Sequence, residues 1–239
     1  MRALFIFSMF LLFTSDICLS QQMKSVLIFS KTTGFRHESI SKGVQTVSRL
    51  LDESGLNAAH TEDASYFCTD SLSKYDAVLF LSTTGDILTK EQKVAFQEFI
   101  QSGKGYVGIH AASDTEYNWP WYGRLVGGYF SSHPAVQEAT INVVDKNHPS
   151  TKHLQNIWIH RDEWYDFKDV KPGLNILMTL DEKSYQGGKM GTLHPIAWFQ
   201  EFDGGRSFYT GLGHTNESFD SANFQKHILG GIFYVLKYN

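Results

Sequence analysis

Residues 105–134 read GYVGIHAASDTEYNWPWYGRLVGGYFSSHP, and this stretch decides the fold. It opens with an apolar run from Tyr106 to Ile109 that is typical of a buried parallel strand. The chain turns polar at His110, and carboxylates follow at Asp114 and Glu116. In an open α/β sheet, ligands bind in the crevice outside the carboxyl ends of the strands. The stretch therefore predicts one strand of such a sheet, with a small-molecule site around His110.

The residues from Gly108 to Ala112, GIHAA, have the pattern of a nucleophile elbow, a sharp turn from a strand into a helix. Small residues are needed on both sides because the turn crowds the backbone and pushes the central side chain into the crevice. Here the central residue is His110, in the place of Ser or Cys. An imidazole can act as a general acid or base or as a metal ligand, but it is a poor nucleophile for acyl transfer.

The rest of the chain supplies further strands and helices. Before the elbow, strands are expected over residues 24–30, 56–61 and 76–82, and helices over residues 39–54 and after a capping box at Thr89 and Gln92. This alternation predicts an α/β fold with a mainly parallel sheet and right-handed crossovers. After the elbow, strands are expected over residues 139–144, 158–167, 175–180, 194–202 and 206–211. The last two should form an antiparallel hairpin that turns at Asp203-Gly204-Gly205. A helix is expected over residues 221–236.

The first twenty residues and the composition bear on location and partners. Arg2, an apolar run from Ala3 to Phe13 and small residues before Gln21 form the pattern of an export signal. We therefore expect a signal peptide over residues 1–20, a single domain over residues 21–239 without a membrane span, and a periplasmic or secreted protein. The net charge of −4, with no basic run, argues against nucleic acid as a partner. Cleavage would leave Cys68 as the one cysteine, so no intrachain disulfide is expected.

Polar residues that follow strands are the candidates for ligand binding, because the carboxyl ends of parallel strands share one edge of the sheet. Aromatic residues near them favour a carbohydrate, since sugar rings stack their C–H faces on aromatic rings. The expected substrate-binding set is Arg36, His37, Asp86, Asp114, Glu116, Trp119, Trp121, Tyr122, His133, Trp164 and Tyr165. Outside it, Arg161 and Asp162 are expected to form a surface ion pair, and His148, His153 and His227 to be solvated.

Five short motifs together resemble the ThuA-like (trehalose utilisation) family over essentially the whole of residues 21–239. They are FSKTTGFRH at residues 29–37, GIHA at 108–111, DEWY at 162–165, HPIAW at 194–198 and GLGHT at 211–215. The resemblance implies the fold of the class I glutamine amidotransferase superfamily, a flavodoxin-like three-layer sandwich. In amidotransferases the elbow residue is Cys and a His follows later in the chain. Here the elbow holds His110, and His214 falls near the place of the later His.

This substitution argues against glutamine hydrolysis, which needs a thiolate at the elbow. The family's association with trehalose, other disaccharides and keto-sugars implies instead acid–base chemistry beside a sugar carbonyl, in an isomerase, hydratase or hydrolase. The expected catalytic residues are His110 and Glu163 as the acid–base pair, with His214 orienting the substrate together with Arg36.

Two alternatives stay open. The chain could be a sugar-binding module without catalysis, which keeps the superfamily crevice after losing the cysteine. It could also be a metal-dependent hydrolase or isomerase in which His110, His133, His214 and a carboxylate such as Glu163 hold a divalent ion, for example zinc. No local pair of histidines has the spacing of a zinc motif, so no cofactor is expected.

Overall fold

The structure of the chain is a computed structural model that describes residues 23–238. The predicted signal peptide over residues 1–20 lies outside the described residues. Within the described part, one sheet of nine strands runs in the order β2-β1-β3-β4-β11-β10-β9-β6-β7, beside a two-stranded sheet of β5 and β8. No helix in residues 23–238 combines the length and the apolar character that crossing a membrane requires.

The first half of the large sheet is parallel and confirms the expected fold class. Its strand order, β2-β1-β3-β4 and then β11, is the 2-1-3-4-5 order of flavodoxin-like folds. Three of these strands are buried along their whole length or nearly so, because helices cover both faces and leave no solvated side. The strands are β1 (Ser25–Phe29), β2 (Asn57–Thr61), β3 (Ala77–Leu81), β4 (Gly105–Ile109) and β11 (Gly205–Thr210).

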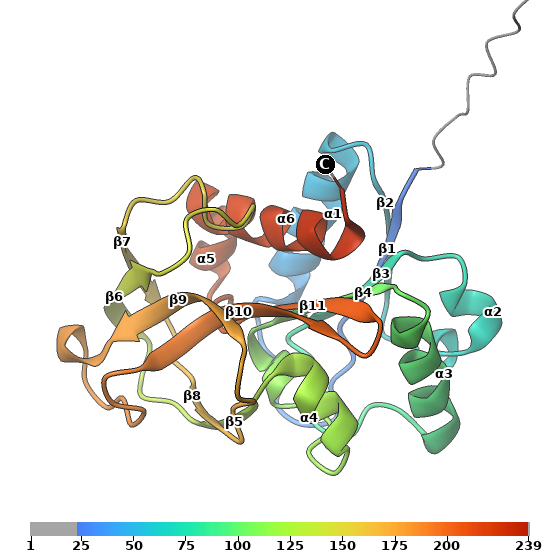
Figure 1. Cartoon of the computed structure of the whole chain (residues 1–239), viewed down its shortest axis with the longest axis horizontal. Helices are drawn as coiled ribbons and strands as arrows, with labels where there is room; N and C mark the ends of the chain where they lie inside the picture. The colour runs from blue at the N-terminus through green and yellow to red at the C-terminus, as the bar shows by residue number, and fades with distance from the viewer. Residues whose placement is uncertain (1–22, 239) are drawn as a thin grey trace, which may run out of the picture.

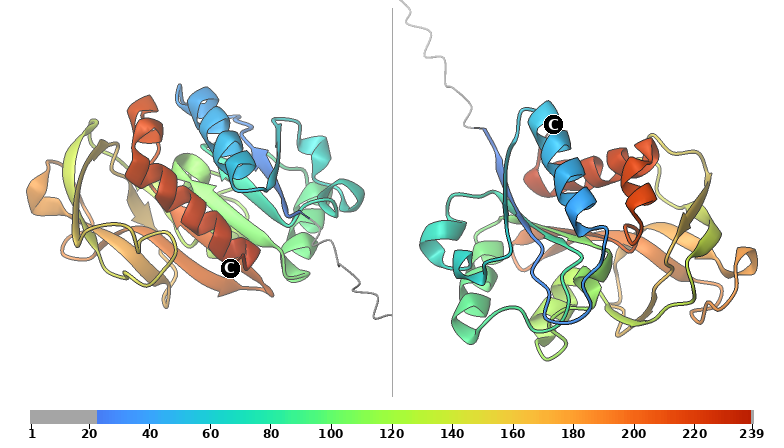
Figure 2. Two further views of the ribbon diagram at one scale, coloured as in Figure 1. Left: turned by 90° about the horizontal axis from the view of Figure 1, so that it is seen from above. Right: turned by 180° about the vertical axis from the view of Figure 1, so that it is seen from behind.

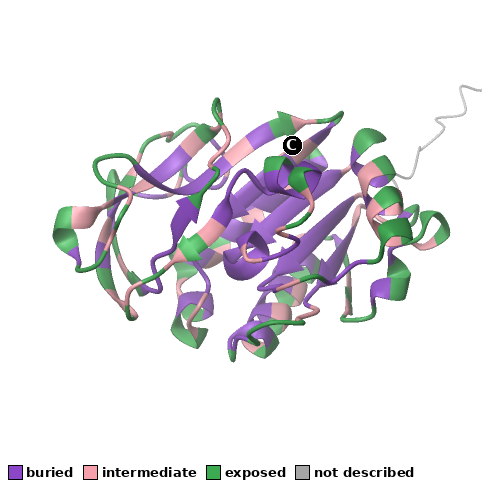
Figure 3. Cartoon of the chain, turned by 90° about the horizontal axis from the view of Figure 1, so that it is seen from below, coloured by how far each residue is buried: buried purple, intermediate pink, exposed green. Residues whose placement is uncertain are grey.

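Helices cover this half on both faces, which gives the three layers (Figures 1 and 2). One face carries α1 (Ile40–Glu53), α5 (Asn216–Asp220) and α6 (Ala222–Leu236), and the other carries α2 (Thr69–Leu72), α3 (Lys90–Gln101) and α4 (Pro120–Val126). The expected capping box starts α3, with the side chain of Thr89 accepting from the backbone of Gln92. The central strands are buried, while the helices expose their outer faces (Figure 3).

The second half of the sheet is antiparallel and extends further than the expected hairpin. The hairpin itself is present between β10 (His194–Phe202) and β11, and Asp203 and Gly204 both have positive φ in its turn. Beyond β10 the sheet continues, antiparallel throughout, through β9 (Asn175–Asp181), β6 (Gln137–Val143) and β7 (Ile157–Asp162). The small sheet pairs β5 (Tyr129–Ser132) with β8 (Asp166–Lys168).

The strand expected over residues 158–167 is in fact two strands. β7 ends at Asp162 and β8 begins at Asp166, so the residues Glu163 to Tyr165 lie between strands of different sheets. The break occurs where the antiparallel half curls back toward the parallel half. Between Pro195 and Trp198 of β10 the pairing with β9 shifts register, and such bulges bend a sheet. The curl frees Glu163 from strand pairing and turns it toward the elbow.

His148 and His227 are buried, so the expectation that they are solvated is wrong for these two. Helix α6 packs closely on the loop that carries Ser150: a Cβ at Gly230 would lie 2.4 Å from the carbonyl carbon of Pro149. This approach encloses both rings. His227 Nδ1 donates to the carbonyl oxygen of Ser150 at 3.0 Å, and His148 Nδ1 lies 2.7 Å from Ser150 Oγ.

These buried rings make stability depend on pH. Burial lowers the pKa of His227 to about 3 and that of His148 to about 4, whereas an unfolded histidine titrates near pH 6.5. As the pH falls below 6.5 the unfolded chain binds protons that the folded chain does not, so stability is lost. We expect His227→Asn, which keeps a donor for Ser150, to make the free energy of unfolding fall less steeply, by about 1.4 kcal/mol per pH unit between pH 6 and 4. Urea unfolding at several pH values measures this, and an unchanged slope would contradict it.

Candidate functional site

The elbow has the sharp turn that the sequence predicts. His110 follows β4 with φ of 51°, in the left-handed region, and opens a short 3-10 helix over His110–Ser113. A Cβ at Gly108 would lie 2.8 Å from Tyr106 Oη and 3.2 Å from the Cβ of Ala112. Both small residues of the pattern are therefore required by the close packing around the turn.

Hydrogen bonding fixes the orientation of the His110 ring. Nδ1 lies 2.8 Å from the carbonyl oxygen of Gly211, which can only accept, so Nδ1 carries a proton. In the neutral ring Nε2 then carries a lone pair, and it points toward Nδ1 of His214 at 3.2 Å. The His110 side chain is fully buried, and Tyr165 lies against it with a ring-centroid distance of 4.2 Å.

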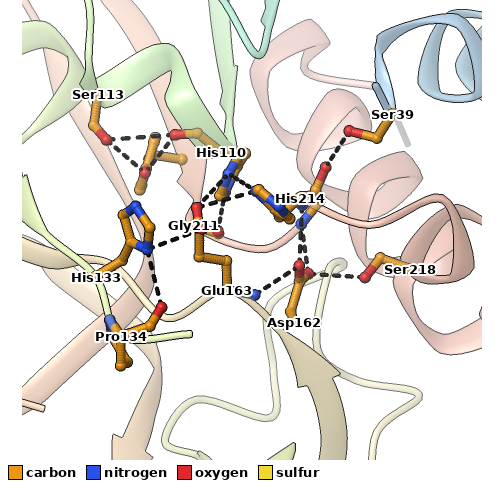
Figure 4. A network of polar contacts seen from close by, with 12 residues as sticks. Ser39, His110, Ser113, His133, Pro134, Asp162, Glu163, Gly211, His214 and Ser218 are labelled. Atoms are coloured by element: carbon orange, nitrogen blue, oxygen red, sulfur yellow. Dashed lines mark hydrogen bonds and ion pairs between the residues drawn. The ribbon is translucent and has the colours of Figure 1, made fainter. Parts of the chain in front are cut away.

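Glu163 lies between three histidines (Figure 4). Its Oε2 is 3.0 Å from His214 Nδ1 and 3.5 Å from His110 Nε2, and its Oε1 is 2.9 Å from His133 Nδ1. Burial alone would raise the pKa of this carboxyl, but hydrogen bonds and charge from His110 and His214 outweigh burial and hold the pKa well below its usual range. Glu163 is therefore an anion that contacts the imidazoles of His110, His133 and His214.

Buried Asp162 positions the loop that carries His214. Its carboxylate accepts hydrogen bonds from the backbone N–H of Gly213 at 2.7 Å and of His214 at 3.0 Å, and from Ser218 Oγ at 2.8 Å. From the other side, Ser39 Oγ donates to the carbonyl oxygen of Gly213 at 3.0 Å. Gly213 has φ of +115°, a conformation that side chains disfavour.

The expected surface ion pair between Arg161 and Asp162 is therefore wrong. Asp162 has no exposed surface because the curl of the sheet carries the end of β7 over the loop after β11. Asp162 also accepts from the backbone N–H of Glu163 at 3.0 Å, so the same carboxylate orders both functional segments.

His37, from the loop after β1, completes the cluster. Its ring centroid lies 4.7 Å from that of His110 and 5.2 Å from that of His214, in edge-to-face arrangements. Burial first, and the neighbouring histidines second, lower the pKa of His37 to about 3, so its ring is neutral. Its Nδ1 is buried without a hydrogen-bond partner in the described part of the chain.

A pocket of about 320 Å³ opens above this cluster. Its lining consists of Phe35, His37, Asp114, Phe130, His133, Glu163, Tyr165 and His214. His110 lies beneath this lining. Asp114 and His214, which also line the pocket, have raised pKa values. Burial raises the pKa of Asp114, which accepts from Tyr117 Oη at 2.6 Å, and the pKa of His214 is raised because Glu163 outweighs burial. The structure thus brings His37, Asp114, His133, Glu163, Tyr165 and His214 together, as expected.

Other expected site residues lie outside the pocket. Arg36 forms an exposed ion pair with Glu62, and Asp86 is exposed. Glu116 is fully buried, where its Oε1 accepts from the backbone N–H groups of Ile87 and Leu88. These residues follow strands, as the sequence pattern predicts, but the side chains of Arg36 and Glu116 bind other loop residues and do not line the pocket.

Most of the expected stacking aromatics belong to the core. Trp119, Trp121 and Tyr122 form one stacked cluster at the start of α4 that packs on α3. Trp164 has no exposed surface, and its Nε1 donates to the carbonyl oxygen of Gln137. The aromatic residues of the pocket are instead Tyr165 and two that the sequence reasoning missed, Phe35 and Phe130. Phe35 is 65% exposed in the polar loop after β1, a position that could have drawn attention to it.

Fold and site together define the class of this protein: it has a glutamine amidotransferase-like fold in which histidine occupies the elbow. The chain belongs to the ThuA family, described as trehalose utilisation, whose family model matches residues 25–235. The resemblance seen in the five motifs is thereby confirmed. A comparison with functionally curated proteins gave no match.

Solved structures agree with this assignment. A ThuA-like protein from Bacteroides uniformis ATCC 8492 is 23% identical with a TM-score of 0.75, covering 89% of this chain and 91% of that chain. A ThuA-like protein from Parabacteroides merdae ATCC 43184 is 24% identical with a TM-score of 0.75, covering 90% of each chain. A β-galactosidase from Bacillus circulans sp. alkalophilus is 13% identical with a TM-score of 0.57, covering 90% of this chain but 30% of that one. At these identities the likeness establishes the fold.

The role of Asp162 can be tested by Asp162→Asn. The amide would place an N–H donor against backbone donors, so we expect the free energy of unfolding to fall by about 1–3 kcal/mol and the NMR signals of the His214 ring to broaden or shift. Asp220→Asn is a suitable control, because Asp220 forms an exposed ion pair with Lys42 that contributes little. Equal effects of the two substitutions would contradict the positioning role.

Proposed function

We propose that the protein acts on a carbohydrate bound in the pocket above Glu163, by acid–base chemistry beside a carbonyl group of the sugar. Membership of the ThuA family supports a role in carbohydrate utilisation. The observation that carries the chemical part is the Glu163 anion, held among His110, His133 and His214 at the base of an open pocket. An anion in this position raises the pKa of His214 and so favours its protonated form, and a positive charge stabilises an enolate oxygen.

The proton affinities suggest separate roles for the groups of the pocket. Glu163 has too low a pKa to be an effective base near neutral pH, and His110 is fully buried. His214 lines the pocket with a raised pKa, so we assign to it the stabilisation or protonation of the carbonyl oxygen. Asp114 also lines the pocket, and burial raises its pKa, which suits a base that removes the proton next to the carbonyl.

The apolar part of the lining fits the same class of ligand. Phe35, Phe130 and Tyr165 line the pocket together with carboxylates and imidazoles. Aromatic faces accept the C–H side of a sugar ring, while the polar groups can pair with its hydroxyls. The volume of about 320 Å³ is at the lower end for small-molecule sites, as a sugar-sized ligand requires.

A hydrogen–deuterium exchange experiment tests the reaction. The protein is incubated in D₂O with the 3-keto derivative of a disaccharide, and loss of the proton next to the carbonyl is followed by ¹H NMR. We expect catalysed exchange that Asp114→Asn slows by about 10²- to 10⁴-fold, the usual contribution of a general base. Asp86→Asn is the matched control, since Asp86 is an exposed carboxylate outside the pocket lining.

Binding without exchange would give a different answer. If the keto-sugar binds in titration calorimetry but no exchange is catalysed, the acid–base proposal fails and the non-catalytic sugar-binding module replaces it. Equal exchange rates for the wild type and Asp114→Asn would contradict the assignment of Asp114 as the base.

Export is a further part of the proposal. It is supported by the positive, apolar and small-residue pattern of residues 1–20. We expect mass spectrometry of the protein from its native host to find a mature chain beginning at Gln21. Recovery of intact residues 1–20 would contradict cleavage.

A further inference from the structure

We propose that His110 Nε2, His214 Nδ1, Glu163 Oε2 and a ring nitrogen of His37 form a binding site for a divalent first-row transition-metal ion such as Zn²⁺. These four residues each bring one ligand atom to within 4.8 Å of the other three. The inference deepens the proposed function, on which its role in the reaction rests, because the ion would lie at the base of the same pocket. Binding of the ion itself can be measured without a substrate.

The distances between the ligand atoms match a metal site. Edges of 3.2, 3.5 and 3.0 Å connect Nε2 of His110, Nδ1 of His214 and Oε2 of Glu163. A tetrahedral Zn²⁺ with ligands at 2.0–2.1 Å separates neighbouring ligand atoms by about 3.3 Å. The three atoms therefore already form a face of such a tetrahedron.

Protein groups outside the cluster orient each of these three ligands. His110 donates Nδ1–H to Gly211, which leaves Nε2 for the ion. Oε1 of Glu163 is paired with His133 Nδ1, which leaves Oε2 of Glu163 for the ion. His214 is fixed through its backbone by Asp162. Hydrogen bonds from protein groups to the far side of histidine and carboxylate ligands are the usual outer shell of metal sites.

His37 supplies independent support for a ligand at this place. Its side chain has 4% exposure, and its Nδ1 has no hydrogen-bond partner in the described part of the chain, which is costly for a buried polar atom. The unpartnered ring lies against His110 and His214, on the side of the cluster that lines the pocket. An ion bound to Nδ1 would supply the partner that this buried nitrogen lacks among the described residues.

A second group, Asp166, Glu182 and His194, has similar spacing, but other protein groups hydrogen-bond to atoms of all three residues. Both oxygens of Asp166 accept hydrogen bonds from Lys189 and Ser132, and Glu182 Oε1 accepts from the backbone N–H of Met190. That group is a closed hydrogen-bond network. The contrast singles out the cluster beneath the pocket.

The chemistry of the ligands selects the kind of ion. Three imidazoles and one carboxylate suit Zn²⁺, Fe²⁺, Co²⁺ or Ni²⁺, whereas Mg²⁺ and Ca²⁺ prefer oxygen ligands. An ion here would lie beneath the bound sugar. By accepting the carbonyl oxygen as a fifth ligand it would supply Lewis-acid polarisation in place of the His214 proton, while Asp114 remains available as the base.

The experiment measures metal binding to the EDTA-treated and dialysed protein. Zn²⁺ is titrated by calorimetry, Co²⁺ by visible absorption, and bound metal is counted by mass spectrometry. We expect one Zn²⁺ per chain, a tetrahedral Co²⁺ spectrum and no comparable affinity for Mg²⁺. His133→Gln, which disturbs the outer shell, should weaken Zn²⁺ about 10- to 100-fold, and Glu163→Gln should weaken it more. His153→Gln is the control, since His153 lies outside the cluster and binds the carbonyl oxygen of Asn223.

The outcomes separate this inference from the proposed function. Absence of stoichiometric Zn²⁺, or equal affinity in the wild type, His133→Gln and Glu163→Gln, overturns the metal site. If Glu163→Gln does not fold, the His133→Gln titration and anomalous scattering at the zinc edge from crystals of the wild type decide. Deuterium exchange that persists at the full rate in metal-free protein overturns the role of the ion in the reaction and leaves the proposed function intact. Stoichiometric Zn²⁺ at the cluster without any exchange supports the metal site and removes the proposed function.

Discussion

The hydrogen bonds that the buried carboxylate of Asp162 accepts from Gly213 and His214 hold the functional part of this protein together. β7 is four strands away from β11 in the sheet, a separation of roughly 19 Å if the sheet were flat. The two elements touch because the antiparallel half curls back, with bulges in β10 at the bend. The carboxylate of Asp162 fastens this curl, and Glu163 follows it directly in the chain. The position of Glu163 is therefore a consequence of sheet curvature.

Sequence reasoning worked where the signal was local. The elbow could be predicted from Gly108, His110 and Ala112 because the turn itself requires small neighbours. The flavodoxin-like order followed from the family resemblance and the alternation of strands and helices. The convergence of His37, Glu163 and His214 is predicted by the shared edge of the parallel strands and by the motifs that carry the family resemblance. What failed depended on tertiary packing: the curl that buries Asp162, the contact of α6 that encloses His227, and the aromatic cluster under α4 that takes up Trp121.

The charge arrangement of the site explains how an amidotransferase-like scaffold tolerates histidine at its elbow. A fully buried imidazole would be costly if charged and unpaired. Here Nδ1 of His110 lies against the carbonyl oxygen of Gly211. Nε2 of His110 lies near both His214 Nδ1 and the Glu163 anion, so both ring nitrogens have polar partners. The same anion raises the proton affinity of His214 at the wall of the pocket. One carboxylate thus makes three neighbouring imidazoles compatible with burial, and it gives the pocket its polar floor.

The division of the sheet into two halves also governs when the site can exist. His37, His110 and His214 come from loops of the parallel half, whereas Glu163 follows the last strand of the antiparallel half. A chain in which only the parallel half has folded would present the imidazoles without their counter-ion. The site is therefore complete only when both halves of the sheet are folded, and any ligand that engages Glu163 together with the histidines stabilises the complete sheet and no partial form of it.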